Sequence, residues 1–314
     1  MDFLQWAKSR TLPSALQTRE GWVSFFEHYR TGEPHIHQIE PTNHCPYTCI
    51  MCPRHTRMNR KKGFMDFAVF QKIIDEISTY SDDVKNKEIE LFHFGESLLH
   101  PEIAKMVSYT SEHNLKATLS INPCDLTQPL IDTLVMSNPY QIIISIDSMD
   151  PDKYRILRGA HANLDKAVIN TSALLRSFQD AKSNTRLTVR MIVMHNNKDE
   201  KDSYTSFWRS QGAEVELRDF FPWNDRSLQE LGNIEKYPHS MPCPFPWQYL
   251  VVQWNGDVVA CCRDYNGQLI LGNVRKQSLI EIWNGQRCTD LRNAIGSGTG
   301  LKQMCQECHS LYNS

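Results

Sequence analysis

Short apolar runs alternate with stretches of helical periodicity through the first two thirds of the chain. Six runs are the right length and composition for strands, at residues 35–42, 88–95, 117–122, 141–147, 186–194 and 214–221. Helices are expected between them. The clearest begins after Asp66, a residue suited to capping, and places five apolar side chains on one face: Phe67, Phe70, Ile73, Ile74 and Ile77. Further helices are expected after Pro101, over 126–136, over 164–178 and over 198–211.

Strand–helix alternation of this kind predicts parallel strands joined by right-handed crossovers. Six strands are too few to close an eight-stranded barrel, so the expected fold is α/β, a partial (β/α)6 TIM-like barrel. In such folds the functional residues lie at the carboxyl ends of the strands.

The pattern changes after Pro222, where four prolines interrupt the chain at 238, 242, 244 and 246. Short strand candidates, a turn at Asn255–Gly256 and several cysteines follow. We therefore expect an N-terminal helical extension over 1–34, the barrel over 35–235 and a small cysteine-rich α+β domain over 236–314.

The 314 residues carry a formal net charge of −2, which gives no general reason to expect nucleic acid or an anionic membrane as partner. No apolar run resembles a signal peptide or a membrane span, so we expect a cytoplasmic protein. Ten cysteines are many for such a chain. Without an export signal, their tight spacing favours metal or cluster ligation over disulfides.

Three of these cysteines, Cys45, Cys49 and Cys52, follow the first expected strand with C-x3-C-x2-C spacing. Three thiolates within eight residues can bind one [4Fe–4S] cluster and leave one iron without a protein ligand. The alternative is structural zinc, which usually takes four ligands in paired C-x2-C spacing. His44 is poorly placed to be a fourth ligand because it is adjacent to Cys45.

This motif after the first strand of a partial barrel resembles the signature of the radical S-adenosylmethionine (SAM) superfamily. The resemblance covers roughly residues 35 to 230. Gly95 and Glu96 end the second strand like the family's Gly-Gly-Glu-Pro motif, with Phe94 and Ser97 as departures. Polar residues after later strands occur in the family's order. The resemblance implies this set of cofactor-binding residues: Tyr47, Gly95, Glu96, Ser120, Asn122, Ser145, Asp147, Arg158 and Val193.

The chemistry implied by the resemblance is reductive cleavage of SAM. The amino and carboxylate groups of SAM chelate the open iron, and the reduced cluster donates an electron to the sulfonium. The resulting 5′-deoxyadenosyl radical removes a hydrogen atom from the substrate. The protein positions the reactants and excludes water.

A second set of thiolates, at Cys243, Cys261, Cys305 and Cys308, provides four ligands for another cubane. This part resembles the auxiliary-cluster domains called SPASM and, in their short form, twitch. Too few cysteines follow Cys305 for the full set, so a single auxiliary [4Fe–4S] cluster is expected. Gly256 followed by four residues and Cys261 matches the SPASM pattern, so the resemblance favours Cys261 over Cys262 as the ligand. Structural zinc is the alternative for this set as well.

Several side chains remain as candidates for other roles. His93, Arg218 and Trp223 are expected near the substrate, although a buried structural role would also explain His93. Cys262 and Cys124 are candidate hydrogen donors to a substrate radical, whereas most free cysteines are small buried apolar residues. The basic stretch 54–62 is either a solvated loop or a surface that attracts an anionic substrate or an acidic electron donor.

The favoured function is oxidation of a small polar molecule, such as a sugar or an aminocyclitol, with the auxiliary cluster taking the second electron. Epimerisation with a cysteine hydrogen donor is an alternative. Maturation of a ribosomally made peptide is less favoured, because only about 35 residues precede the first strand. A non-enzymatic iron–sulfur carrier would leave the SAM-binding motifs unexplained. A flavodoxin or ferredoxin-type electron donor is the expected protein partner.

Overall fold

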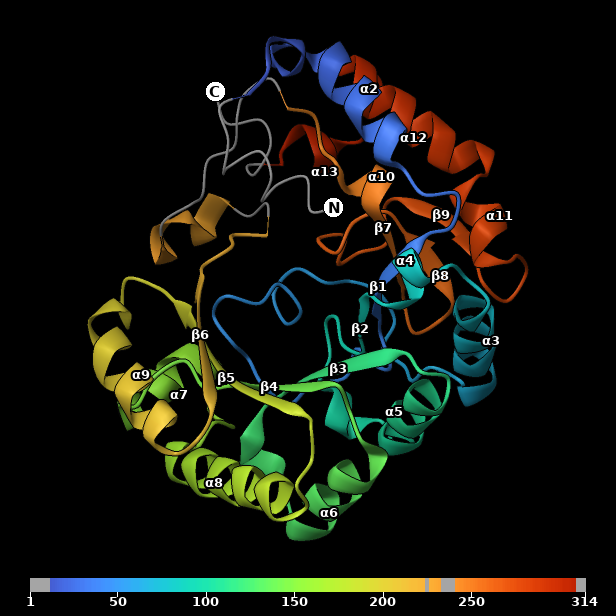
Figure 1. Cartoon of the computed structure of the whole chain (residues 1–314). Coiled ribbons are helices and arrows are strands. Elements are labelled where there is room, and N and C mark those ends of the chain that lie inside the picture. Colours follow the sequence, from blue (N-terminus) through green and yellow to red (C-terminus); the bar gives the residue numbers. More distant parts are fainter. Residues whose placement is uncertain (1–11, 224–225, 233–240, 309–314) are drawn as a thin grey trace.

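The computed structural model describes residues 12–223, 226–232 and 241–308 (Figure 1). Within these residues one sheet has the strand order β6-β5-β4-β3-β2-β1-β7-β8-β9. All pairings from β6 through β1 to β7 are parallel, and β8 and β9 continue the sheet in antiparallel fashion. The strands are β1 His35–Ile39, β2 Glu88–Glu90, β3 Lys116–Ile121, β4 Gln141–Ser145, β5 Arg186–Val193, β6 Glu214–Asp219, β7 Tyr249–Val252, β8 Asp257–Val259 and β9 Ile270–Asn273.

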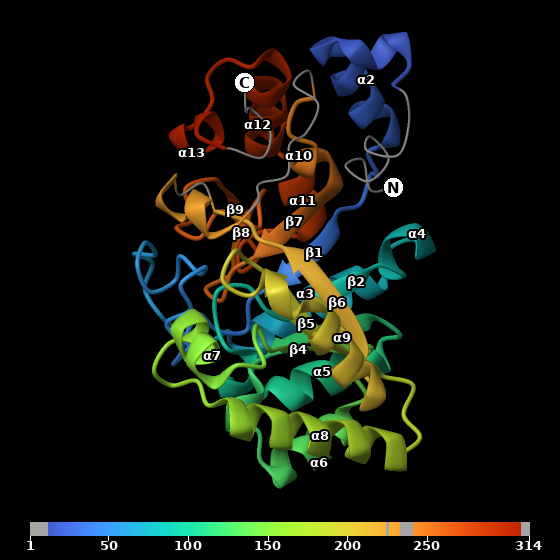
Figure 2. The ribbon, with the colours of Figure 1, turned by 90° about the vertical axis from the view of Figure 1, so that its left-hand side faces the viewer.

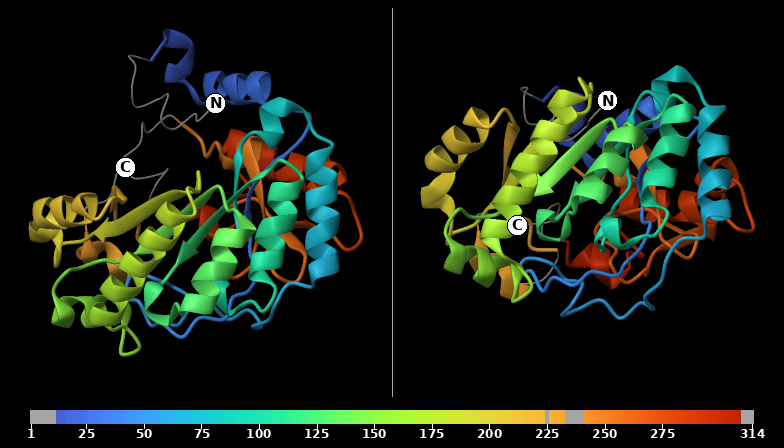
Figure 3. Two further views of the ribbon diagram at one scale, coloured as in Figure 1. Left: turned by 60° about the horizontal axis from the view of Figure 1, so that its bottom comes forward. Right: turned by 90° about the horizontal axis from the view of Figure 1, so that it is seen from below.

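The six predicted barrel strands are therefore β1 to β6, and the α/β partial-barrel fold is confirmed. Helices cover the outer face of the curved sheet, side by side in Figure 3. They are α3 Phe67–Ser78, α5 Ile103–Glu112, α6 Gln128–Ser137, α8 Leu164–Asp180 and α9 Lys201–Ser210. The segment predicted as one helix over 198–211 begins as a 3₁₀ turn, η4 Lys198–Glu200, before α9.

Sequence periodicity missed α7, Pro151–Arg158, because the helix is short and only partly apolar. Its N-terminus is nevertheless well specified. The Asp150 side chain accepts hydrogen bonds from the backbone N–H groups of Asp152 and Lys153, and Pro151 occupies the first turn, where it is well tolerated. The remaining short elements of the barrel are α4 Asp82–Lys85, η2 Ser97–Leu99, η3 Pro123–Asp125 and η5 Arg226–Leu231.

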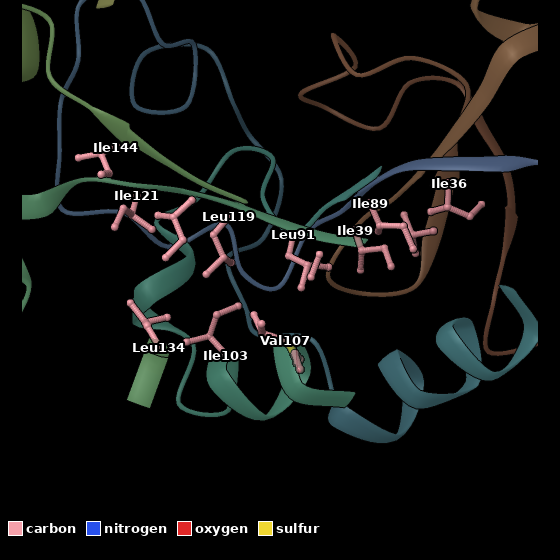
Figure 4. Packing of buried hydrophobic residues seen from close by; sticks show 14 of the residues in the cluster. Ile36, Ile39, Ile89, Leu91, Ile103, Val107, Leu119, Ile121, Leu134 and Ile144 are labelled. Atoms are coloured by element: carbon pink, nitrogen blue, oxygen red, sulfur yellow. The ribbon is translucent and has the colours of Figure 1, made fainter. Parts of the chain in front are cut away.

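The main core lies between the sheet and this helical layer. Figure 4 shows strand side chains such as Ile89, Leu119 and Ile121 facing Ile103 and Val107 of α5. All five are almost completely buried. Burying each side chain stabilises the fold by roughly 1.5–3 kcal/mol. This layer fixes the strands whose carboxyl ends form the site.

The C-terminal part continues the barrel sheet, since β7 pairs with β1 in parallel. It also contains α10 Phe245–Gln248, α11 Leu279–Trp283, α12 Gln286–Ser297 and α13 Gln303–Gln306. The chain before β1 forms η1 Ser14–Gln17 and α2 Arg19–Tyr29, and α2 lies beside α12 (Figures 1 and 2). A separate apolar cluster packs α2 against α10 and α12, and it includes Trp22, Phe26, Trp247 and Ile295. The expected domain boundaries remain predictions.

The carboxylate of Glu40, immediately after β1, is completely buried and joins four segments. Arg60 donates to both of its oxygens, at 2.9 and 2.8 Å, and the His93 ring lies 3.6 Å away. The backbone N–H of Trp254, in the β7–β8 turn, donates to it at 3.2 Å. Burial opposes ionisation, but the adjacent His93 ring and the hydrogen bonds from Arg60 outweigh burial and lower the Glu40 pKa to about 2.

Arg60 extends this network by donating from Nε to the backbone oxygen of Tyr265 at 2.7 Å. It therefore connects the loop after the cysteine triplet both to the barrel and to the C-terminal part. The basic stretch 54–62 is thus not uniformly solvated, because Arg54 is buried and the Arg60 side chain is only 9% exposed.

Within the described residues, no helix is both long and apolar enough to cross a bilayer.

Removing one partner of the buried Arg60–Glu40 pair should strongly destabilise the protein. We predict that Arg60→Met lowers the free energy of unfolding by about 3–5 kcal/mol, because an uncompensated carboxylate stays buried. Arg155→Met is the control: it breaks an ion pair with Asp152 whose side chains are 67% and 89% exposed, and should cost less than about 1 kcal/mol. Urea unfolding followed by circular dichroism measures both. Equal losses in the two variants would contradict the assigned role of Glu40.

Candidate active site

The cysteine triplet lies on the loop after β1, and the C-terminal end of α7 binds this loop. The backbone N–H of Thr48 donates to the oxygen of Arg158 at 3.2 Å, and that of Ile50 donates to the oxygen of Leu157 at 3.0 Å. Gly159 has φ +91°, and a Cβ there would lie 2.0 Å from Thr48 Oγ1. Only glycine permits this close approach of helix and loop.

Cys45, Cys49 and Cys52 line one cavity of about 940 Å³. Ligand pockets are commonly about 300–1,000 Å³, so this cavity has room for SAM and a small substrate together. Five residues predicted to bind the cofactor line the same cavity: Gly95, Ser120, Asn122, Ser145 and Arg158. The structure thus brings together the three thiols and the carboxyl ends of β2, β3 and β4.

The three thiols are in an environment that keeps them protonated when no cation is bound. Burial raises the pKa of Cys45 and of Cys49 to about 12, and it also raises the pKa of Cys52. Iron ligation would replace these protons, because a thiolate is the ligating form. The donor set fits a cluster with one iron open to the cavity.

A buried polar network lies beneath this part of the cavity. Glu96 accepts hydrogen bonds from the backbone N–H of Asn122 at 3.0 Å and from its Nδ2 at 2.5 Å. Arg158 Nη1 donates to Asn122 Oδ1 at 2.7 Å, and its Nε pairs with Asp147 Oδ2 at 2.5 Å. Burial raises the Glu96 pKa to about 7, against the opposing effect of the Asn122 hydrogen bonds. Glu96 and Asp147 do not line the cavity, so their contacts orient side chains that do.

The strand predicted over 88–95 ends at Glu90, and at Gly95, in the loop after β2, the backbone comes close to the segment that leads into the cysteine loop. A Cβ at this position would lie 2.0 Å from the backbone oxygen of Thr42. The next residue continues the contact, because the Glu96 N–H donates to the His44 oxygen at 2.8 Å. The missing first glycine of the family motif is Phe94, whose ring packs on Trp223 with centroids 5.1 Å apart.

Besides Glu96 and Asp147, three more predicted residues lie outside the cavity lining. Tyr47 is buried and donates to Asp125 Oδ2 at 3.0 Å. Val193 ends β5, but strand alternation turns it away, and Ile192 lines the cavity instead. Cys124 is buried against Tyr154 and Asn163, with its Sγ 3.3 Å from the Asn163 oxygen. Cys124 is therefore poorly placed to donate a hydrogen atom into the cavity.

The candidate substrate residues and Cys262 all line the cavity. His93 is a structural link as well, because its Nε2 lies 2.7 Å from the backbone oxygen of Cys262. The Cys262 Sγ lies 3.4 Å from the Tyr249 hydroxyl. Trp223 adopts a left-handed backbone conformation, φ +51°, which is uncommon for a bulky residue.

The second cysteine set lines a separate, smaller pocket between β8 and the C-terminal helices. Cys243, Cys261, Cys305 and Cys308 all belong to its lining, and Cys262 does not. This agrees with the preference for Cys261 drawn from the spacing. The free volume is about 30 Å³, so the four side chains would have to turn outward around a bound cubane.

Within the described residues, no three His, Cys, Asp or Glu side chains are spaced to hold a single metal ion. The cysteines of each set are nevertheless brought together, since each set lines one pocket.

Sequence reasoning missed several residues of the site. Arg54 lines the cavity and donates to the Tyr47 oxygen at 3.1 Å. Glu40 precedes the cysteine motif but has no sequence signature of its own. Arg263 follows the cysteine pair directly, and this adjacency was the available signal.

Exchange of each member of the 261–262 pair should distinguish the cluster ligand from its neighbour. After anaerobic reconstitution we expect Cys261→Ser to lower the iron content from about eight to about four per chain, with Cys262→Ser unchanged at about eight. Iron and acid-labile sulfide analyses measure this. Loss of iron in Cys262→Ser alone would reverse the assignment.

Adding one methyl group at Gly95 should disturb SAM binding, because the backbone must move away from Thr42. We expect Gly95→Ala to weaken SAM binding by about tenfold or more, a cost of about 1.4 kcal/mol or more. Gly32→Ala is the matched control, since a Cβ there meets nothing within 4 Å. Equilibrium dialysis with labelled SAM compares the two, and equal affinities would contradict the proposed role of Gly95.

Comparison with known proteins agrees with this arrangement. The chain is 22% identical over 282 residues to the S-adenosyl-L-methionine-dependent 2-deoxy-scyllo-inosamine dehydrogenase of Niallia circulans, covering 87% of this chain and 92% of that protein. The structure of BtrN in complex with AdoMet and 2-DOIA matches with a TM-score of 0.57 and 20% identity, over 88% of this chain and 93% of BtrN. Streptococcus suis SuiB bound to its precursor peptide SuiA matches with a TM-score of 0.68 and 12% identity, over 92% of this chain and 72% of SuiB.

Two family models match separate parts of the chain. The radical SAM superfamily model covers residues 39–205, and an iron–sulfur cluster-binding domain model, SPASM, covers residues 243–309. The first match spans more than half of the chain and contains the cysteine triplet, and the second contains the four-cysteine pocket. The chain therefore belongs to the radical SAM superfamily, as an enzyme with a C-terminal SPASM domain.

Proposed function

We propose that this radical SAM enzyme is an oxidoreductase that removes two hydrogens from a small polar molecule such as a sugar or an aminocyclitol. One observation carries the proposal. The cavity lined by Cys45, Cys49 and Cys52 is also lined by Phe245 and Arg263, which line the four-cysteine pocket too. A substrate in this cavity would lie between two iron–sulfur sites.

Two [4Fe–4S] clusters fit the two thiol sets: Cys45, Cys49 and Cys52 would hold one, and Cys243, Cys261, Cys305 and Cys308 the other. The first cluster and SAM, when bound, supply the one-electron chemistry that removes a hydrogen atom from the substrate. A cluster held by the second thiol set would supply the acceptor for the substrate's remaining electron, and the accompanying proton would go to solvent. Two hydrogens leave the substrate, and the electrons balance.

The chain's own residues would position SAM at the carboxyl ends of β2 to β4. The backbone at Gly95, which lies close to Thr42, would receive the methionine amino group of SAM. Arg158 is held by Asp147 and Asn122 and faces the cavity, so it is placed to attract the carboxylate of SAM. Ser120 and Ser145, whose hydroxyl oxygens are 3.5 Å apart, would contact the ribose.

The cavity wall beyond the SAM region suits a substrate with several hydroxyl or amino groups. Arg190 and Glu216 form an ion pair at 2.7 Å, and His37 and Glu90 lie 3.7 Å apart. Arg218 extends from β6 into the same lining. The dehydrogenase of Niallia circulans acts on 2-deoxy-scyllo-inosamine, a substrate of this chemical class.

Epimerisation is the second candidate, and the position of Cys262 favours it. This cysteine lines the cavity and is outside the four-cysteine pocket, so its thiol is available to return a hydrogen atom. Peptide modification draws support from the likeness to SuiB, which was solved with a precursor peptide, and to the PqqA peptide cyclase of Xanthomonas oryzae, which is 20% identical over 312 residues.

The electron donor would be a flavodoxin or a ferredoxin-type protein. The exposed Lys61 and Lys62 follow the cysteine loop and would attract an acidic donor.

Product mass tests the proposal. Reconstituted enzyme is incubated anaerobically with SAM, dithionite and a panel of aminocyclitols and sugars, including 2-deoxy-scyllo-inosamine. We expect 5′-deoxyadenosine and a product lighter by two hydrogens. Unchanged mass with deuterium uptake from heavy water would instead establish epimerisation. The absence of 5′-deoxyadenosine with every small molecule, together with its formation with a peptide, would overturn the proposed substrate class.

Arg218→Met should raise KM for the accepted substrate by about tenfold or more, because a hydrogen bond to a charged group contributes roughly 1.5–3 kcal/mol. Lys276→Met, at an exposed position in the β9–α11 turn, serves as the control. Steady-state kinetics at saturating SAM measures both, and a KM unchanged in Arg218→Met would exclude direct substrate binding by Arg218.

A further inference from the structure

Arg263 lies in the wall that separates the substrate cavity from the four-cysteine pocket. It lines both, as does Phe245. The side chain is buried, with 8% of the residue exposed. Its guanidinium carbon lies 3.8 Å from the ring centre of Phe221 and 5.2 Å from that of Phe245. Both rings line the substrate cavity, so the guanidinium stands immediately behind its surface.

The same residue contacts two of the four thiols. Arg263 Nη1 donates to Cys308 Sγ at 3.5 Å, and its backbone N–H donates to Cys261 Sγ at 3.4 Å. Hydrogen bonds to the ligand sulfurs, nearby charge and solvent exclusion are the factors that tune an iron–sulfur cluster. Arg263 combines all three.

We propose that Arg263 raises the reduction potential of the auxiliary cluster and thereby makes that cluster an acceptor for the substrate's second electron. The inference rests on the proposed function, which places a cluster on these four cysteines. Reduction adds one negative charge to the cluster. A fixed cation behind two cysteine sulfurs stabilises that added charge strongly, because burial limits screening by water.

Arg263 would affect one step of the reaction, the transfer of the substrate's second electron to the auxiliary cluster. The substrate has already lost a hydrogen atom to the SAM-derived fragment. It then gives one electron to the auxiliary cluster, which is reduced by one electron, and one proton to solvent. A lower cluster potential makes this transfer less favourable and leaves the hydrogen-atom abstraction unaffected.

Arginine suits this position better than lysine does. Its planar guanidinium can stack on Phe221 while an N–H group points at Cys308. Lysine would retain the charge but lose the planar stacking surface and the fixed direction of the donor. A substitution series at this residue therefore separates charge from geometry.

The test measures the potential of the auxiliary cluster alone, in the chain carrying Cys45→Ala, Cys49→Ala and Cys52→Ala. Arg263→Met and Arg263→Lys are added to this background. Arg218→Met is the matched control, since Arg218 lines the substrate cavity but not the four-cysteine pocket. Each protein is reconstituted anaerobically, its iron is counted, and it is titrated with dithionite under electron paramagnetic resonance.

We expect about four irons per chain in every protein. Arg263→Met should make reduction at least about tenfold less favourable, a shift of about 59 mV to more negative potential for one electron. Arg263→Lys should shift it in the same direction by less, and Arg218→Met should leave it unchanged.

The outcomes separate the two proposals. If Arg263→Met retains its iron and its cluster potential is unchanged, the proposed role of Arg263 is overturned. The proposal that the four cysteines bind an auxiliary cluster is then still supported. Absence of iron from the triple variant itself overturns both. If Arg263→Met is the only variant that loses its iron, its potential cannot be measured, and the Arg263→Lys variant becomes the test. An auxiliary-cluster potential in Arg263→Lys equal to that of the triple Cys→Ala chain would overturn the inference.

Discussion

The buried carboxylate of Glu40 is the constraint on which the geometry of the site depends. A charge removed from water must be paired, and Glu40 obtains its partners from the cysteine loop, from the loop after β2 and from the β7–β8 turn. Arg60 and His93 are thereby fixed relative to one another. Arg60 also donates to the Tyr265 oxygen, and His93 lies against the Cys262 oxygen. The Glu40 carboxylate therefore fixes the barrel relative to the C-terminal part, where the two together form one wall of the cavity.

This wall explains how one cavity serves two redox sites. The parallel strands present their carboxyl ends to the cysteine triplet, as expected for a barrel. The pairing of β7 with β1 brings the C-terminal part to the same opening. Arg263 and Phe245 then separate the cavity from the four-cysteine pocket. A substrate held there would be within reach of both the hydrogen-atom acceptor and the electron acceptor.

Hydrophobic periodicity was sufficient to predict the six barrel strands, and cysteine spacing drew attention to two cysteine sets, each of which lines one pocket. The interest of Gly95 and Asn122 came instead from the resemblance to the radical SAM superfamily, and both line the cavity. Contacts between distant segments were not predictable in the same way. No sequence motif around Glu40 indicates that its carboxylate binds Arg60 and the backbone N–H of Trp254. Val193 shows a finer limit: its strand was correct, but the face it presents depends on a register that one sequence does not fix. Arg263 became interpretable only when both pockets were in view.

The most direct measurement of the central claim is iron and sulfide per chain, after anaerobic reconstitution, for the wild type and for Cys45/Cys49/Cys52→Ala. The account of two independent clusters predicts about eight irons in the wild type and about four in the variant. Four irons retained by the variant would place an electron acceptor beside the substrate cavity. No iron in the variant would contradict the account and favour a reaction without net oxidation of the substrate.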